Sequence, residues 1–387
     1  MLIIYLTEQG SELTKEGHHL VVRKGEYSHT IFTHKVSQIV AIGNIKISHQ
    51  ALVQIFSVGV DMVFLAQNGK YIGRLACEEP KNIFLRRKQF LLSDNGEFSL
   101  KIAKSIVIGK LTNLITVLMR IQRTKNAPQA KDKANQIRML LKNVEDATSV
   151  DSVRGYEGRG SQLYFSALKY GLKNDYGFTK RVRRPPTDPV NSLLSLLYTF
   201  LMNKVYIAIR LASLEPYIGT LHTLDYGRYS LVFDLMEEFR PIIADTLMLS
   251  LFNLEILKDS SFEKEITTPL EEAKEEGNED EISKAINDPI GLMRPYTLDD
   301  NFTPLPEQRV SEELEDNVNS TGKYPVKLKP DAIKKVIEAF EKKISTKFYH
   351  PLAGKDLTYE DAINFQARYY RRVIEGEVGE YVPLLLR

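Results

Sequence analysis

The stretch VNSLLSLLYTFLMNKVYIAIRLASL, residues 190–214, decides the fold because it is apolar almost all the way round. Thr187 or Asp188, followed by Pro189, precedes it, and an N-cap residue followed by proline is typical of the start of a helix. The apolar run is interrupted by Asn191, Asn203, Lys204 and Arg210. They exclude a simple membrane span. A helix without a polar face is buried on all sides, so we expect this one to be the centre of a helical domain.

The first eighty residues have a different pattern. Short β-branched or aromatic runs alternate with turn signals such as Gln9-Gly10 and Lys24-Gly25, which is typical of β-strands. A short helical pattern over residues 49–59 interrupts them. From Asn82 onward the spacing of apolar residues becomes helical. The sequence therefore predicts an α+β fold, with a small N-terminal β-sheet domain (residues 1–80) followed by a larger all-α domain (residues 81–387).

Charge is distributed unevenly along the chain, although the net charge is only +2. Residues 81–142 contain fourteen Lys and Arg but three acids, whereas residues 255–285 contain eleven acids and four bases. The basic helices indicate a surface that binds a polyanion. We expect the acidic segment to be a mobile surface insertion without chemistry of its own.

The single cysteine, Cys77, excludes an intramolecular disulfide and a thiolate metal cage. The N-terminal apolar run is short, and it has neither a preceding basic region nor a small-residue cleavage site, so it does not resemble a signal peptide. We therefore expect a soluble, cytoplasmic protein that does not bind a membrane.

One stretch, residues 221–241, concentrates candidate metal ligands. It contains His222 and the acids Asp225, Asp234, Glu237 and Glu238. The last three stand at i, i+3 and i+4, which a helix would place on one face. Carboxylates with one imidazole suit Mg²⁺ or Mn²⁺. The Asp234–Glu237 spacing is also that of a helix-capping box, the commoner use of such a pair.

Glu157 is a further candidate, because it stands alone among Gly155, Gly158 and Gly160 ahead of an amphipathic run. An acid in the first turn of a helix would have the same appearance.

Two basic clusters are candidates for contacts to a nucleic-acid backbone. The first, Lys180, Arg181, Arg183 and Arg184, precedes Pro185-Pro186, and it fits a phosphate clamp or an exposed linker equally well. The second lies in a helical pattern near the C-terminus, where Arg368, Arg371 and Arg372 accompany Tyr369 and Tyr370. That pattern fits a nucleic-acid face, but a tyrosine pair on a helix is also typical of the edge of a core.

Several blocks together carry a family resemblance. The four longest are GYEGRGSQLYFSAL (155–168), RRPPTDPVNSLLSLLYTFL (183–201), LASLEPYIGTLH (211–222) and SLVFDLMEEFRPIIAD (230–245). In order and spacing they resemble the Cas-one family, the CRISPR-associated integrases that acquire spacers. Residues 47–75 and 348–376 resemble the same family, so the likeness extends over nearly the whole chain. One departure is the small residue before Leu214 in ASLEPY, because many relatives have glycine at that position.

The resemblance implies that Glu157, His222 and Glu237 bind Mg²⁺ or Mn²⁺, and that Asp234 is an orienting residue or a second ligand. It implies a metal-dependent DNA endonuclease and integrase that inserts short DNA fragments into a CRISPR repeat array. In that reaction a DNA 3′-hydroxyl attacks a phosphodiester by transesterification. The implied partners are duplex DNA with free 3′-OH ends, branched DNA, the repeat array, a second copy of the chain and the small adaptation protein Cas-two.

Two other functions remain open from the residues themselves. One is a stand-alone, structure-selective nuclease of DNA repair. The other is a non-catalytic DNA-binding scaffold, in which Asp234 and Glu237 form a helix cap and Glu157 is a first-turn acid. For each function we expect the same arginines to contact the phosphate backbone of DNA: Arg181, Arg183, Arg184, Arg371 and Arg372.

Overall fold

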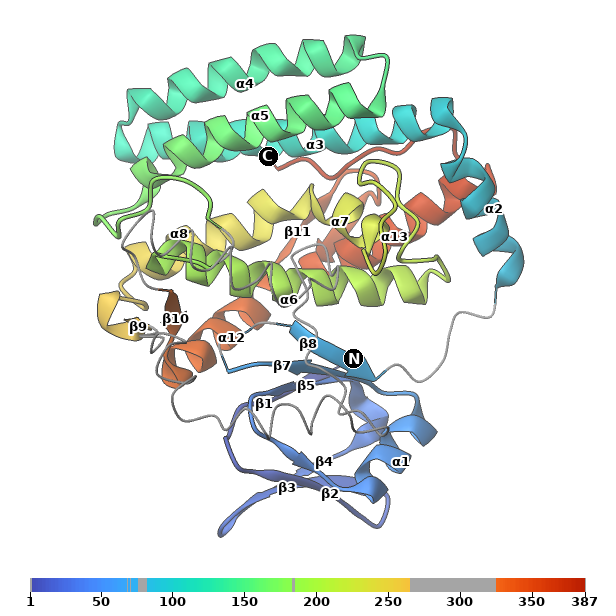
Figure 1. Ribbon diagram of the computed structural model, residues 1–387, viewed down its shortest axis with the longest axis vertical. Helices are drawn as coiled ribbons and strands as arrows, with labels where there is room; N and C mark the ends of the chain where they lie inside the picture. The colour runs from blue at the N-terminus through green and yellow to red at the C-terminus, as the bar shows by residue number, and fades with distance from the viewer. Residues whose placement is uncertain are drawn as a thin grey trace, which may run out of the picture.

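The structure is a computed structural model, and it describes residues 2–67, 69, 71–75, 82–182, 185–264 and 325–386. Figure 1 shows a helical body above a smaller β-rich part that contains the N-terminus. The β-rich part has two four-stranded sheets, ordered β1-β5-β7-β8 and β4-β3-β2-β6. Its elements are β1 (Leu2–Leu6), β2 (Glu12–Glu16), β3 (His19–Lys24), β4 (Tyr27–Ile31), β5 (Val36–Ile42), β6 (Lys46–Ile47), α1 (His49–Val58), β7 (Asp61–Leu65) and β8 (Tyr71–Leu75).

A core of its own holds the β-rich part together. Leu13 and Leu20 from one sheet pack with Ile39 and Met62 from the other, and all four are fully buried. Every second side chain of a strand points toward the facing sheet, so even short strands contribute side chains to this core. Ser48 accepts a hydrogen bond from Ala51 N, so a serine cap begins α1.

The helical body is built around α6 (Pro189–Leu211), which corresponds to the predicted central helix. Asp188 caps it and Pro189 occupies its first turn, as expected. The other helices are α2 (Ile83–Ser93), α3 (Gly96–Lys125), α4 (Pro128–Asp146), α5 (Val150–Leu168), α7 (Ser230–Met236), α8 (Thr246–Asn253), α12 (Pro330–Ile344) and α13 (Tyr359–Glu375), with a π-helix, η3, at Arg240–Asp245.

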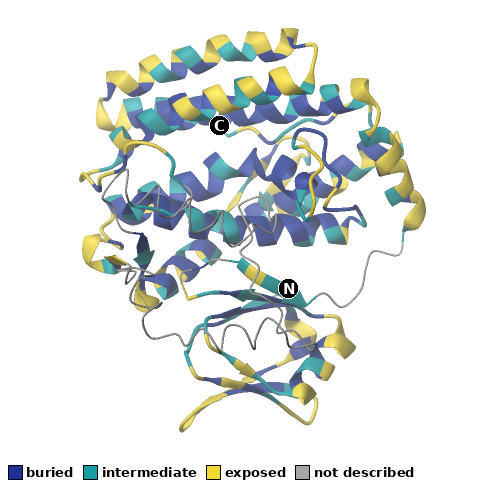
Figure 2. Ribbon diagram, in the orientation of Figure 1, coloured by how far each residue is buried: buried dark blue, intermediate teal, exposed yellow. Residues whose placement is uncertain are grey.

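Burial explains the layers of this body. In Figure 2 α6, α7 and α8 are mostly buried, whereas α4 alternates between buried and exposed residues. By length and composition, α3 and α6 are each apolar enough to cross a membrane, but 67% and 78% of their most apolar windows lie inside the protein. Such burial is typical of the core helices of a globular domain.

The β-rich part and the helical body meet through partly buried polar contacts. Tyr5 of β1 donates a 2.7 Å hydrogen bond to Glu341 of α12. Lys204 of α6 forms ion pairs with Glu341 at 3.3 Å and with Glu360 of α13 at 3.2 Å. Arg74 of β8 stacks on the Tyr206 ring at 3.6 Å. These contacts fix the β-rich part against the central helix.

The predicted α+β class, a β-sheet region followed by a mostly helical one, is confirmed. The helical body also contains two short antiparallel pairs. One joins β9 (Phe262–Lys264) to β10 (Val326–Leu328), and the other joins β11 (Lys347–His350) to β12 (Lys355–Thr358). The boundary at residue 80, Cys77, Arg183, Arg184 and most of the acidic segment 255–285 lie outside the described residues.

Candidate active site

A buried lysine brings the predicted carboxylates together. Lys110 extends from the middle of α3, and its side chain is 7% exposed. Its ammonium group forms an ion pair with Glu157 of α5 and a second one, at 2.6 Å, with Glu237 just after α7. Ser161, one turn after Glu157, donates a 2.9 Å hydrogen bond to the same Glu157 oxygen. Two carboxylates from different helices therefore converge on one positive charge.

His222 is held beside these carboxylates by Asp234. The fully buried Asp234 carboxylate accepts the backbone N–H groups of Thr220, Leu221 and His222 at 2.6–3.0 Å. Its Oδ1 also lies 2.7 Å from Nδ1 of the His222 ring. This bond assigns the ring proton to Nδ1 and leaves the lone pair on Nε2, which lies 3.9 Å from Glu237 Oε1.

The turn around Asp234 requires a glycine. A side chain at Gly219 would come within 2.6 Å of the Asp234 carboxylate and within 3 Å of the backbone of Ser230 and Leu231. Only a residue without a Cβ lets the loop approach the start of α7 so closely.

A second cation contacts Glu237. Arg240 Nη1 lies 3.2 Å from Glu237 Oε1, and its guanidinium stacks on the Tyr198 ring at 5.2 Å. Burial alone would raise the pKa of Glu237, but the charges of Arg240 and Lys110 outweigh it and lower that pKa to about 2. Lys110 likewise lowers the pKa of Glu157 against the opposing effect of burial. Both acids are therefore carboxylates at neutral pH.

The π-helix that begins at Arg240 ends at a buried acid. Asp245 accepts hydrogen bonds from the hydroxyl groups of Tyr198 at 2.7 Å and Tyr164 at 2.9 Å. Burial raises the pKa of Asp245 to about 6. π-Helical turns are rare and often occur at functional sites. Here the wide turn places Arg240 beside Glu237, and it places Asp245 beside Tyr198 of α6.

The raised pKa of Asp245 predicts a pH dependence of stability. The folded protein keeps the Asp245 proton up to about pH 6, whereas the unfolded chain releases it near the usual value of 3.8. The stabilisation is therefore complete below pH 3.8 and is lost as the pH rises through 6. Relative to Asp245→Asn, wild type should lose about 3 kcal/mol of unfolding free energy over this range. Urea unfolding at pH 4, 5 and 6 measures the difference, and parallel curves for the two proteins would contradict it.

Two interpretations of this region are wrong. Glu157 is the eighth residue of α5, and the first-turn acid of that helix is Asp151. Asp234 lies inside α7, which begins after Tyr229, so it does not cap a helix. The helical stretch does not gather its three acids on one partner, because the Glu238 carboxyl group is bonded to Tyr381, Gln366 and Leu384 instead. Asp225 is exposed in the loop after His222.

The metal ligands themselves remain a prediction. Over the ranges given above for the structure, no three His, Cys, Asp or Glu side chains stand close enough together to hold a metal ion. The reason is local, since the ammonium group of Lys110 lies between the two glutamates. Sequence reasoning missed Lys110, Arg240 and Asp245. The available signal for Lys110 was a single lysine within the apolar run SIVIGKLTNLITVL.

The predicted DNA-binding arginines have protein partners where they are described. Arg181 donates to Asn191 and Ser195 at 3.0 Å, which ties the preceding loop to α6. Arg371 pairs with Glu375 at 2.9 Å, and Arg372 pairs with Glu377 at 3.1 Å. Arg181 therefore has a structural role, and DNA binding by Arg371 and Arg372 remains a prediction.

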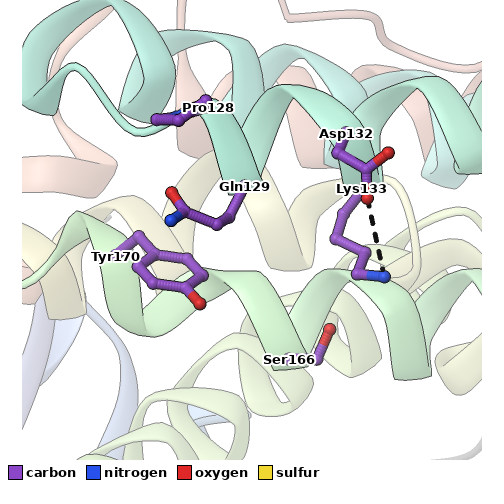
Figure 3. Close-up of a pocket in the computed structure, with 6 residues that line it drawn as sticks. All are labelled: Pro128, Gln129, Asp132, Lys133, Ser166 and Tyr170. Atoms are coloured by element: carbon purple, nitrogen blue, oxygen red, sulfur yellow. Dashed lines mark ion pairs between the residues drawn. The ribbon is translucent and has the colours of Figure 1, made fainter.

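A groove of about 620 Å³ lies away from this cluster, between the start of α4 and the end of α5 (Figure 3). Its lining residues are Pro128, Gln129, Asp132, Lys133, Ser166 and Tyr170. Asp132, which pairs with Lys133 at 3.7 Å, is the only acid among these six residues. We therefore place the candidate active site at the Glu157–Lys110–Glu237 cluster.

Known proteins resemble this chain along most of its length. The family model described as CRISPR associated protein Cas1 matches residues 4–274. The CRISPR-associated endonuclease Cas1 3 of Thermus thermophilus is 30% identical over 388 residues, which cover 100% of this chain and 97% of that protein.

Two solved structures share the fold. A casposase bound to integration product has a TM-score of 0.75 at 18% identity, covering 99% of this chain and 93% of that chain. A Cas6-RT-Cas1–Cas2 complex has a TM-score of 0.76 at 20% identity, covering 100% of this chain and 36% of that chain. The resemblance inferred from the sequence blocks is thereby confirmed. Because the family model spans most of the chain and a Cas1 endonuclease aligns with all of it, this protein belongs to the Cas1 family of CRISPR-associated proteins.

Proposed function

We propose that this chain is a divalent-metal-dependent DNA endonuclease and integrase. It would insert short DNA fragments into a CRISPR repeat array through attack of a 3′-hydroxyl on a phosphodiester. One observation carries the proposal: Glu157 and Glu237 share a buried cation while His222 directs Nε2 toward Glu237. Repelling carboxylates are brought together at a cost, so a pair held around a positive charge indicates a site for a cation.

The donor set fits Mg²⁺ or Mn²⁺. Glu157 and Glu237 would supply carboxylate oxygens and His222 would supply Nε2, and Mn²⁺ accepts a nitrogen ligand more readily than Mg²⁺. Such an ion polarises a phosphodiester and stabilises its developing negative charge. The Oε2 atom of Glu237 supports the fit. It is buried and forms an ion pair with Lys110, but it accepts no hydrogen bond from the described residues, so it has a lone pair available for a cation. Lys110 would have to move aside when the ion enters.

The residues around the donors have positioning roles. Asp234 fixes the tautomer and the orientation of His222, as outer carboxylates do for metal-binding histidines. Arg240 keeps Glu237 ionised and oriented. Ser161 donates a hydrogen bond to Glu157. The proposal requires no covalent protein nucleophile, because the 3′-hydroxyl of the incoming strand forms the new P–O bond as the target strand's P–O bond breaks, which releases the target strand with a free 3′-hydroxyl.

The proposed partners are DNA and other proteins. The DNA would be a duplex with free 3′-OH ends, a branched intermediate or the repeat array. The casposase is bound to an integration product, which supports DNA as a partner of this chain. The Cas6-RT-Cas1 chain is in a complex with Cas2, which supports Cas2 (Cas-two) as a second partner. We also propose a homodimer and a cytoplasmic location.

A joining assay tests the function. Purified protein, with and without Cas2, receives a short duplex with free 3′-OH ends and a plasmid that carries a repeat array, in Mg²⁺ or Mn²⁺. Joined products at the repeat edge are expected, and Glu157→Gln should abolish them. Cutting without joining would instead indicate a repair nuclease. DNA binding with neither cutting nor joining in either metal would indicate a scaffold.

Asp234→Asn should weaken Mn²⁺ binding by about 10- to 100-fold, the usual effect of losing an outer-shell partner. The amide keeps the shape of the side chain but cannot hold the Nδ1 proton and the three backbone N–H groups equally well. Mn²⁺ titration followed by electron paramagnetic resonance measures the affinity. Asp259→Asn, in an exposed turn, is the matched control. Equal Mn²⁺ affinity in the two variants would contradict the orienting role of Asp234.

A further inference from the structure

The chain returns to the candidate site after α13. Residues 378–386, here named the C-terminal strap, run back along α3 in Figure 1. Lys101 of α3 donates a 2.7 Å hydrogen bond to Gly379 O at the beginning of the strap. Tyr381 and Leu384 are 2% and 3% exposed, so these two side chains anchor the strap in the core.

Glu238, the residue next to Glu237, is the main anchor of the strap. Its fully buried carboxyl group accepts a 2.6 Å hydrogen bond from the Tyr381 hydroxyl and another from Leu384 N. Gln366 of α13 donates to both Glu238 oxygens at 3.2 Å. Every polar contact of this carboxyl group is therefore directed to the strap or to the helix that precedes it.

Asn113 connects the strap to the other side of the site. It lies on α3 one turn after Lys110, and its amide donates to Glu238 O at 3.0 Å and to Leu384 O at 2.9 Å. Its Oδ1 accepts the Leu386 N–H at 2.7 Å. A single buried side chain thus bonds the strap and the backbone beside Glu237 at the same time.

Close packing completes this connection. Pro383 lies against Gly109, the neighbour of Lys110, and a methyl group at Gly109 would overlap the proline ring. The strap can therefore occupy its place only because α3 has a glycine at that point. Gly109 and Asn113 flank Lys110 on the helix, and Glu238 is bonded covalently to Glu237.

We propose that the C-terminal strap is a positioning element for the candidate active site, with Tyr381 and Glu238 as its positioning residues. The inference rests on the proposed function, because the geometry that the strap fixes is that of Lys110 and Glu237. Loosening the strap frees the backbone at Glu238 and the neighbouring surface of α3 together. Active sites need their functional side chains held to within about 0.5 Å, which the first contact layer alone rarely achieves.

Tyr381→Phe tests the strap with the least disturbance. It removes the hydroxyl bonded to Glu238 but keeps the ring that packs on Tyr369 and Tyr370. The matched control is Tyr5→Phe, which removes a 2.7 Å bond from a half-buried tyrosine to Glu341, a residue of α12 that does not contact the site. We expect Tyr381→Phe to weaken Mn²⁺ binding about tenfold and Tyr5→Phe to leave it unchanged, even where both lower the melting temperature equally.

Gly109→Ala provides an independent test, since the methyl group must displace Pro383. Its control is Gly96→Ala at the start of the same helix, where a methyl group meets no other atom within 4 Å. Hydrogen exchange without metal is measured for residues 235–240 in all four variants. Faster exchange there in Tyr381→Phe and Gly109→Ala, but not in the controls, is the expected result.

The two measurements distinguish failure of the positioning role of the strap from failure of the proposed function. Unchanged hydrogen exchange and unchanged Mn²⁺ affinity in Tyr381→Phe and Gly109→Ala would overturn the positioning role. If wild type binds no Mn²⁺, the proposed function fails, and the exchange measurement still decides whether the strap holds residues 235–240. A loss of affinity that is equal in the test and control variants would mean general destabilisation and would also overturn the proposal.

Discussion

Glu237→Gln is expected to abolish strand transfer and Mn²⁺ binding, with a loss greater than the 10- to 100-fold typical of an outer-shell change. The glutamine keeps the volume of the side chain but removes the charge that Lys110 and Arg240 share. Glu237 is also the donor nearest to His222 Nε2. No other described carboxylate contacts both Lys110 and Arg240, so no neighbour can substitute for it.

The joining assay and a Mn²⁺ titration measure this effect. Glu255→Gln is a control of the same chemistry, because Glu255 is a half-exposed glutamate that pairs only with surface lysines. Strand transfer by Glu237→Gln within a fewfold of the Glu255→Gln rate would contradict a role for Glu237 as a metal ligand.

Lys110→Met is expected to have the largest effect on stability without metal, about 3–5 kcal/mol, the usual cost of removing one partner from a buried ion pair. The change leaves two carboxylates facing each other with Arg240 as their remaining neighbouring cation. The same change should strengthen Mn²⁺ binding, because no ammonium group competes for the position between Glu157 and Glu237. Mn²⁺ at 100 times its dissociation constant would then restore about 2.7 kcal/mol.

Urea unfolding with and without Mn²⁺ measures both parts of this prediction. Lys204→Met is the control, since Lys204 is a second buried lysine that bridges two glutamates, Glu341 and Glu360, away from the site. At the same Mn²⁺ concentration, Lys204→Met should gain only the stabilisation that wild type gains, because its affinity for the ion is unchanged. An equal gain in Lys110→Met and Lys204→Met would mean that the Lys110 ammonium group does not compete with Mn²⁺.

The sequence was sufficient for the architecture because the decisive patterns are local. The all-round apolar character of residues 190–214 predicts a buried central helix, and a capping residue at 187 or 188 followed by Pro189 predicts where it begins. The short β-branched and aromatic runs of the first eighty residues, separated by turn signals, likewise predict strands. Short pairs such as β9–β10 escape this reasoning, because their strands are three residues long and join segments far apart in the chain.

The site was predictable only in part, because its contacts are long-range. Glu157, His222, Glu237 and Asp234 were named through the family resemblance, while the i, i+3, i+4 spacing grouped Glu238 with Asp234 and Glu237, with which its side chain shares no partner. Its true partners, Tyr381 and Leu384, lie more than 140 residues away. Lys110 was counted with the basic helices as a candidate for DNA contact, and burial between two acids is a property that no local pattern reveals.

The most direct test of the central claim is a crystal structure of the protein soaked in Mn²⁺, with anomalous diffraction measured at the manganese edge. We predict one anomalous peak bonded to Glu157, Glu237 and His222 Nε2, with the Lys110 ammonium group displaced from between the glutamates. A protein that joins DNA under the same conditions, yet shows no peak there and keeps Lys110 in place, would contradict the account.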